Sequence, residues 1–189
     1  GSALTRRLRE RFRFCFLPLP NPDGTAHGRS VTNARDEVPM FSFGQLLAGK
    51  PAPAETKALW QYAEQLHPSA YIEFHTHYQD TRAHKLNPMG LEWFPKNQHE
   101  RVRSVDKALL AINSEWRLTP IERSTPLCEC GKFVNLTERL GVLSYCYQIY
   151  AVSEEATCAH ATTVIATLAR ALAGPEWEAQ MPAPKITPG

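Results

Sequence analysis

Three groups of polar residues in the sequence could do chemistry together. His75 and His77 stand in the segment HTHYQ, directly after a short apolar run. Glu154 and Glu155 follow the apolar segment YQIYAVS, and the turn sequence NPDG at Asn21–Gly24 follows the apolar segment RFRFCFLPL. Imidazole is a good zinc ligand, zinc lowers the pKa of water to about 7, and a nearby carboxylate can accept the proton. Hydrolysis of an amide bond is the chemistry that these groups suit.

The elements that would position these groups alternate between strand and helix. Hydrophobic periodicity predicts strands over 11–19, 71–74 and 147–153, helices over 54–66, 99–113 and 161–173, and a long functional loop over 25–43. Residues 114–141 show no clear pattern. The alternation predicts a layered α/β domain with a mixed, largely parallel sheet flanked by helices, in which groups that follow parallel strands gather at one edge.

Composition narrows the function classes. The 189 residues are 43% hydrophobic and 21% charged, which is typical of a soluble globular domain. A formal net charge of +2 gives no reason to expect nucleic acid or a membrane as a partner. Five cysteines, an odd number, with no apolar leader predict a cytoplasmic protein rather than a disulfide-linked secreted one.

The domain is expected to span residues 1–175, with a Pro-rich tail over 176–189. Gly1–Ala3 resembles a cloning remnant, so the natural start is expected to lie further upstream. We therefore expect the domain to be incomplete at its N-terminal side.

Two motifs resemble the zinc carboxypeptidase family. FLPLPNPDG at Phe16–Gly24 is similar to the strand and turn of that family, and HTHYQ at His75–Gln79 is similar to the strand that ends in its third zinc ligand. The resemblance covers the C-terminal two thirds of the family's catalytic domain. It implies a zinc carboxypeptidase-like fold, a zinc cofactor, and cleavage of an amide or peptide bond next to a carboxyl-terminal or acylated amino acid.

The resemblance also implies catalytic roles for particular residues. His75 becomes the zinc ligand, and Arg29 becomes the residue that polarises the scissile carbonyl. Glu155 becomes the general base, with Glu154 as the alternative. Glu155 is preferred because Ser153, a small hydroxyl residue, lies two positions before it and would share its face of a strand.

Four further residues are expected to contact the substrate, namely Asn33, Arg35, Gln79 and Tyr147. The family normally has an Asn-Arg pair that binds the substrate carboxylate, and this pair is absent here. Arg35 could replace it, because a guanidinium can bind a carboxylate through two hydrogen bonds. Each of these functional roles has a structural alternative. His75 would be a hydrogen-bonded structural residue, Glu154 and Glu155 would be solvated, and Arg29 and Arg35 would lie on a loop surface.

The sequence departs from the family at the first two zinc ligands. The family has an H-x-x-E motif upstream of the NPDG turn, and no histidine here is followed by Glu at the third position. Two alternatives remain open. A further segment or chain supplies the missing ligands of a peptide or acyl-amino-acid hydrolase, or the protein is a metal-free, carboxypeptidase-like binding or partner subunit.

Overall fold

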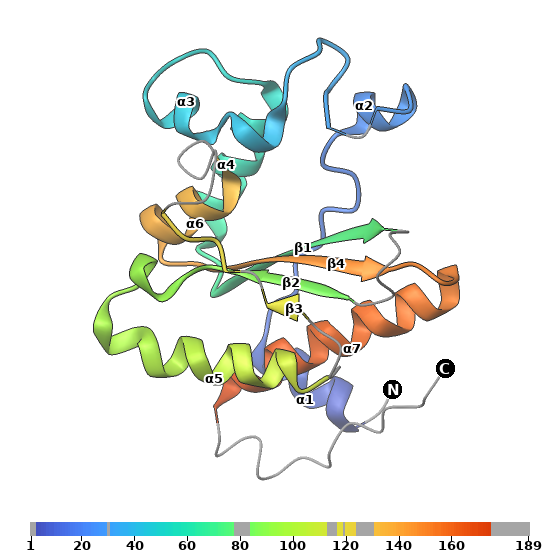
Figure 1. Ribbon diagram of the computed structural model, residues 1–189, viewed down its shortest axis with the longest axis vertical. Coiled ribbons are helices and arrows are strands. Elements are labelled where there is room, and N and C mark those ends of the chain that lie inside the picture. The colour runs from blue at the N-terminus through green and yellow to red at the C-terminus, as the bar shows by residue number, and fades with distance from the viewer. Residues whose placement is uncertain are drawn as a thin grey trace.

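A four-stranded mixed sheet forms the middle layer of the protein (Figure 1). The computed structural model describes residues 3–29, 31–77, 84–112, 117–118, 120–123 and 131–174. The strands are β1 (Ala70–His77), β2 (Lys85–Pro88), β3 (Arg117–Leu118) and β4 (Leu143–Tyr150), in the spatial order β1-β4-β2-β3. Strand β4 pairs in parallel with β1 and antiparallel with β2, and β2 pairs in parallel with β3. The expected layered α/β domain with a mixed sheet is confirmed.

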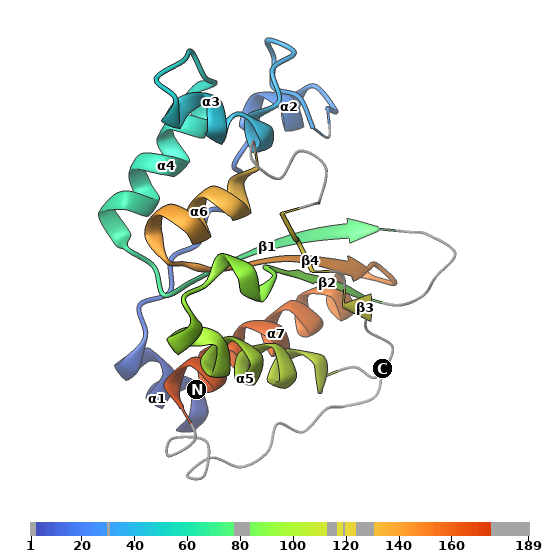
Figure 2. The same ribbon diagram turned by 60° about the vertical axis from the view of Figure 1, so that its left-hand side comes forward.

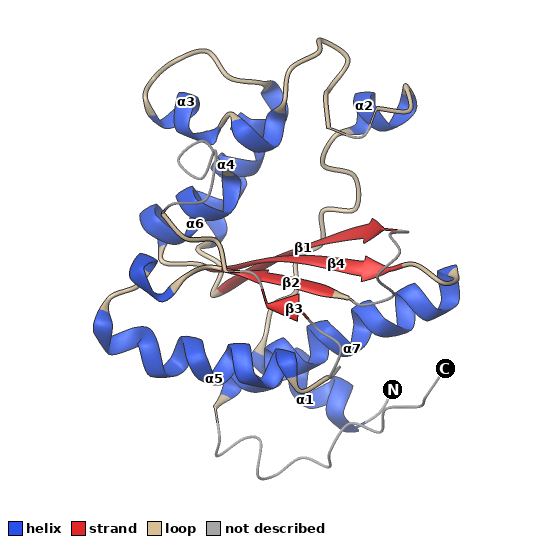
Figure 3. Ribbon diagram, in the orientation of Figure 1, coloured by secondary structure: helices blue, strands red, loops and turns tan. Residues whose placement is uncertain are grey.

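Helices cover both faces of this sheet (Figures 2 and 3). They are α1 (Ala3–Arg11), α2 (Pro22–Ala26), α3 (Phe43–Leu47), α4 (Ala54–Leu66), α5 (His99–Leu110), α6 (Lys132–Leu140) and α7 (Glu154–Ala173), with short 3-10 helices η1 (Pro39–Phe41), η2 (Leu91–Trp93) and η3 (Lys96–Gln98). Helices α5, α7 and α1 lie on one side of the sheet, and α6, α4 and α3 lie on the other (Figure 1). No helix in the described part of the chain is both long and apolar enough to cross a bilayer.

The main core lies between the sheet and helices α5 and α7. Alternate residues of β4 point to this side, because successive side chains of a strand face opposite ways. The buried side chains are Tyr145, Tyr147 and Ile149 from β4, Val102, Val105 and Leu109 from α5, and Val164 and Leu168 from α7. A smaller cluster of Phe43, Trp60, Ala63, Leu136 and Val142 joins α3, α4 and α6 on the other side.

Several local predictions are confirmed. The helix expected over 54–66 is α4, with the same bounds, and the strand expected over 71–74 lies within β1, nearer to its start. Helix α5 lies within the range 99–113. Helix α6 was not predicted from the sequence, and β4 begins and ends earlier than the expected strand over 147–153.

The buried strand expected over 11–19 is wrong. Helix α1 ends at Arg11, and the residues that follow form no strand and leave Phe16 71% exposed. Pro18 and Pro20 lack the backbone N–H that a strand ladder needs, and no described strand lies beside this segment. The NPDG turn that follows is the short helix α2, in which the Asn21 side chain accepts a hydrogen bond from Gly24 N at 3.0 Å.

Candidate active site

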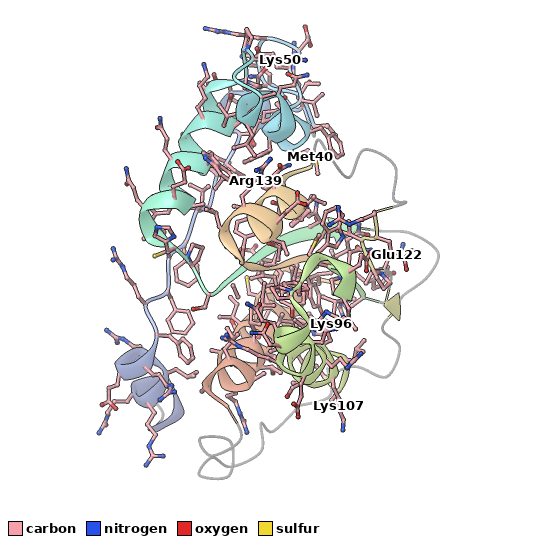
Figure 4. All side chains as sticks on the ribbon, turned by 90° about the vertical axis from the view of Figure 1, so that its left-hand side faces the viewer. Met40, Lys50, Lys96, Lys107, Glu122 and Arg139 are labelled. Carbon is pink, nitrogen blue, oxygen red and sulfur yellow. The ribbon has the colours of Figure 1, made fainter. Side chains whose placement is uncertain are left out.

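A cavity of about 240 Å³ lies between β1 and the segments on the α3, α4 and α6 side of the sheet. Met40, on one of its walls, lies between the blue-green helix α3 above it and the orange helix α6 below it (Figure 4). Polar groups from separate elements meet in the cavity, and apolar side chains form the rest of its wall. The lining residues are Pro20, Asn21, Thr25, Arg29, Val31, Pro39, Met40, Phe43, Glu55, Thr56, Leu59, Glu73, Phe74, His75 and Lys132.

His75 is held in one orientation by Glu73. The two residues are two positions apart on β1, so their side chains share a face of the sheet. His75 Nε2 lies 2.7 Å from Glu73 Oε1, and the carboxylate accepts the Nε2–H, which leaves Nδ1 as the nitrogen with a lone pair. Burial lowers the pKa of His75, so the imidazole is neutral near pH 7. A neutral imidazole is the form that binds metals.

Glu73 is itself fixed by two further groups. The Tyr71 hydroxyl donates to Glu73 Oε2 at 2.8 Å, and the Lys132 ammonium forms an ion pair with the same oxygen. The Lys132 side chain is only 5% exposed and also lies over the rings of Tyr71 and Phe133. Burial lowers the pKa of Lys132 to about 8, so the ammonium is still largely charged at pH 7. The network joins β1 and α6 beneath the cavity.

Arg29 supplies a second cation to the cavity. Its Nη1 donates to the carbonyl oxygen of Asn33 at 2.9 Å and to the carboxylate of Asp36. Its backbone N–H donates to Gly24 O at 2.8 Å, which ties this residue to helix α2. The NPDG sequence contributes to the site in two ways, because Asn21 lines the cavity and the α2 helix anchors the loop carrying Arg29.

The structure gives Asn33 a different place from the one predicted. Its side chain is buried, and its Oδ1 accepts hydrogen bonds from the backbone N–H groups of Arg35 and Glu37. Its Nδ2 donates to the carboxylates of Glu37 and Glu55. Asn33 thus shapes the loop, since its hydrogen-bonding groups are occupied. Arg35 is exposed and does not line the cavity.

Glu154 and Glu155 lie in the first turn of α7 and are exposed, not at the end of a strand. Strand β4 ends at Tyr150, and the side chain of Ser153 caps α7 by accepting a hydrogen bond from Ala156 N at 3.1 Å. The argument that Ser153 and Glu155 share a strand face therefore fails. Neither glutamate lines the cavity.

Tyr147 points to the opposite face of the sheet from His75, which corrects its predicted contact with substrate. It is fully buried in the α5 and α7 core, where its ring lies 5.6 Å from that of Phe74 and its hydroxyl bonds to His160. Burial raises the pKa of its hydroxyl. The β4 residue that pairs with His75 is Gln148. Gln79 lies outside the described residues.

The residues present fit a metal at one position. A histidine that donates one ring N–H to a carboxylate and keeps the other nitrogen free is the usual arrangement of a metal-binding histidine. His75 with Glu73 has this arrangement. The described ranges of the chain contain no group of three His, Cys, Asp or Glu side chains that could hold a metal ion. They therefore supply one ligand and not a complete site.

Three residues of this network, Tyr71, Glu73 and Lys132, were missed in the sequence. Glu73 could have been found, because it lies two positions before His75 in a segment that was correctly predicted to be a strand. Lys132 could not, because residues 114–141 showed no pattern that assigned it to a helix over the sheet.

Comparison with known structures places this arrangement in a known fold. A metallo-carboxypeptidase from Burkholderia cenocepacia matches with a TM-score of 0.73 and 15% identity, over 92% of this chain and 49% of that one. A putative carboxypeptidase from Burkholderia mallei matches with a TM-score of 0.67 and 16% identity, over 96% of this chain and 49% of that one. This chain has a zinc carboxypeptidase-like fold.

A third carboxypeptidase-like match is a metallo-carboxypeptidase from Pseudomonas aeruginosa, solved in complex with (2-guanidinoethylmercapto)succinic acid. It has a TM-score of 0.57 and 15% identity, over 79% of this chain and 43% of that one. This carboxypeptidase-like chain spans about half the length of the solved structures that it matches. No family model and no curated protein matches its sequence.

Proposed function

We propose that this chain forms part of a zinc-dependent hydrolase of the carboxypeptidase type, which cleaves an amide or peptide bond next to a carboxyl-terminal or acylated amino acid. The observation that carries the proposal is the pair formed by His75 and Glu73 in a cavity that also contains Arg29. A carboxylate-oriented neutral imidazole is suited to hold zinc, and a nearby guanidinium is suited to a developing negative charge.

Each of these residues has its own role in the proposed reaction. Zinc held by His75 would supply Lewis acidity to the scissile carbonyl. Arg29 donates hydrogen bonds to the carbonyl oxygen as negative charge develops there, and Glu73 keeps the His75 ring in its orientation. Glu155 remains the candidate base, with Glu154 as its alternative, because both follow the end of β4, the strand beside β1.

The remaining parts of the proposal come from outside the cavity. A segment or chain with an H-x-x-E motif supplies the other zinc ligands, and Arg35 and Gln79 remain candidates for contact with the distal part of a peptide substrate.

We also propose a cytoplasmic location, in agreement with the free thiols of Cys15, Cys146 and Cys158.

A second candidate function is a metal-free subunit that binds a ligand in the same cavity. The buried Lys132 ammonium favours it, because a cation already neutralises Glu73 beside His75. In this case Arg29 donates hydrogen bonds to a bound anion, His75 stays bonded to Glu73, and no bond is cleaved.

Hydrolysis of an acylated dipeptide that ends in leucine separates the two candidates. With zinc and the H-x-x-E segment present, we expect cleavage of the free acid, and a loss in kcat/KM of about 100-fold in Arg29→Gln, typical of a lost donor to the oxyanion. Arg103→Gln is the matched control, because Arg103 is an exposed residue of α5, which lies on the opposite side of the sheet from the cavity (Figure 1). Absence of cleavage by the wild type under these conditions would favour the metal-free subunit.

A further inference from the structure

The segment that follows helix α1 is exposed along its whole length. Each residue from 13 to 20 is exposed, including Phe16 at 71% and Leu17 and Leu19 at 49% each. With Phe14, four of these eight consecutive residues are large apolar ones. Single exposed apolar side chains are ordinary, but a contiguous row of them marks a surface that contacts another molecule. We refer to residues 13–20 as the apolar segment.

The aromatic rings of the apolar segment point away from the body of the protein. The ring centroids of Phe12 and Phe14 lie 6.2 Å apart, as expected of two residues on the same side of an extended chain. Cys15 faces the other way and forms a side-chain hydrogen bond with Tyr62 of α4. The contact with α4 therefore holds the backbone of the segment and leaves Phe14 and Phe16 turned toward solvent.

Helix α1 places a concentrated positive charge next to the apolar segment. Residues 6–13 contain five arginines and one glutamate, a formal charge of +4, although the whole chain carries only +2. The helix and the segment follow each other along one side of the molecule (Figure 4). The arginines are all exposed and are Arg6, Arg7, Arg9, Arg11 and Arg13. The low net charge of the chain thus conceals a strongly basic surface.

This combination of groups fits the surface of an anionic bilayer better than a nucleic acid. Guanidinium groups attract anionic lipid headgroups, and phenylalanine and leucine side chains are stabilised by insertion at the boundary of the acyl chains. Single-stranded nucleic acids also bind basic aromatic surfaces, but they do so by stacking bases on the rings. Leu17 and Leu19 offer no ring for a base, whereas both suit lipid.

We propose that α1 and the apolar segment bind the surface of an anionic membrane, with the arginines among the headgroups and with Phe16 and Leu17 inserted below them. The contact is peripheral, and the chain lies on the bilayer. A cytoplasmic protein meets such a surface, because the cytoplasmic leaflet carries the anionic lipids. The proposal depends neither on zinc nor on hydrolysis.

Sedimentation with lipid vesicles tests this surface. We expect vesicles with about one third phosphatidylserine to bind the protein at least about tenfold more tightly than vesicles of phosphatidylcholine alone, and the affinity to fall as salt is raised. Arg9→Gln combined with Arg13→Gln removes two charges and is expected to weaken binding to the anionic vesicles by about tenfold or more. Phe16→Ser is expected to weaken it by about tenfold, because the inserted ring is lost.

Two further variants serve as matched controls. Arg103→Gln combined with Lys107→Gln removes the same charge from exposed positions of α5, and Lys107 lies apart from α1 in Figure 4. Val152→Ser removes an apolar side chain that is 76% exposed and lies outside the apolar segment. We expect each control to change the affinity by less than about twofold. All the substituted residues are exposed, so the fold is expected to be retained, which circular dichroism verifies.

Three results would overturn the proposal. Equal binding to the two kinds of vesicle would exclude the arginines as anchors to anionic lipid. Wild-type binding by a folded Phe16→Ser would show that the apolar segment is not inserted. Tighter binding to a single-stranded oligonucleotide than to the anionic vesicles would assign the surface to nucleic acid. Because the assay contains no zinc and no substrate, its outcome is separate from that of the proposed function.

Discussion

The two faces of the sheet have different compositions and different tasks. Toward α5 and α7, strands β1 and β4 present Phe74, Tyr145, Tyr147 and Ile149 to a dense apolar core. Toward α6, α4 and α3, alternate positions of the same strands present Glu73, His75 and Gln148 to a cavity or its surroundings. Because strand side chains alternate, each strand contributes to both faces at once. The comparison shows how stability and chemistry are separated within one sheet.

The buried charges sharpen this comparison. On the cavity side, the ion pair of Lys132 and Glu73 is built into the wall and orients His75. On the core side, burial raises the pKa of Asp106 to about 6 and lowers that of His160 to about 4, so His160 is neutral at pH 7 whereas Asp106 stays largely ionised. The carboxylate on the core side accepts a hydrogen bond from Tyr145, whereas the cavity side holds an ion pair that orients a histidine.

Truncation of the core should have the largest effect on stability. Leu109→Ala, in the fully buried face of α5, is expected to lower the free energy of unfolding by about 3 kcal/mol through the cavity that it leaves. Urea unfolding measures this. The control Leu17→Ala, at a side chain 49% exposed, should change it by less than about 0.5 kcal/mol. Equal effects of the two substitutions would contradict the division between core and surface.

Removal of the buried cation on the cavity side should have the next largest effect. Lys132→Met leaves Glu73 as an uncompensated carboxylate and is expected to lower the free energy of unfolding by about 2 kcal/mol, somewhat less than for a fully buried pair because Glu73 is 18% exposed. The double variant with Glu73→Gln removes both charges and should recover much of this loss. If the two single losses simply add in the double variant, the ion pair does not couple these residues.

The neutral histidine of the core side predicts a pH dependence of stability. The pKa of His160 is about 4 in the folded protein and 6.5 in the unfolded chain, so the unfolded chain binds the proton more readily. Its contribution to stability is fully present above pH 6.5 and is lost as pH falls from 6.5 toward 4. His160→Gln should reduce the change in stability between pH 6.5 and pH 4, which thermal unfolding measures. The expected reduction is about 1 kcal/mol, because the side chain is partly exposed to solvent. An unchanged pH profile in the variant would contradict it.

The smallest expected effect comes from the cap of α7. Ser153→Ala removes the side-chain acceptor for Ala156 N and should cost about 0.5–1 kcal/mol. Ser104→Ala, at an exposed position inside α5, is the control and should be neutral or slightly stabilising. If the Ser153 substitution has no larger effect than the control, Glu154 and Glu155 do not belong to a capped helix.

Local patterns in the sequence predicted the elements whose structure is decided locally. Helix α4 has apolar residues at helical spacing and is followed by Pro68, and β1 is a short apolar run, so both could be located. The aromatic alternation of residues 11–19 gave a wrong strand, because a strand also needs a neighbour with which to pair. Near Glu154, a serine followed by two acidic residues is a helix-start signal, and that signal prevailed over strand periodicity.

The candidate site could be predicted only in part for a similar reason. His75 and Arg29 were identified by resemblance, and both line the cavity. Lys132 belongs to a helix that packs over the sheet and lies 59 positions after its partner Glu73 in the chain, and nothing in its own segment indicated that contact. Contacts between distant segments depend on packing, which local periodicity does not encode.

Zinc content tests the central claim most directly. It should be measured by mass spectrometry on the purified protein with any native upstream sequence restored, in the wild type and in His75→Ala. The account predicts about one zinc per wild-type molecule and none in the variant, with thermal unfolding of the two metal-free proteins nearly the same, because His75 is half-exposed and contributes little to the core. Equal zinc content in both proteins, or no zinc in the wild type, would contradict it.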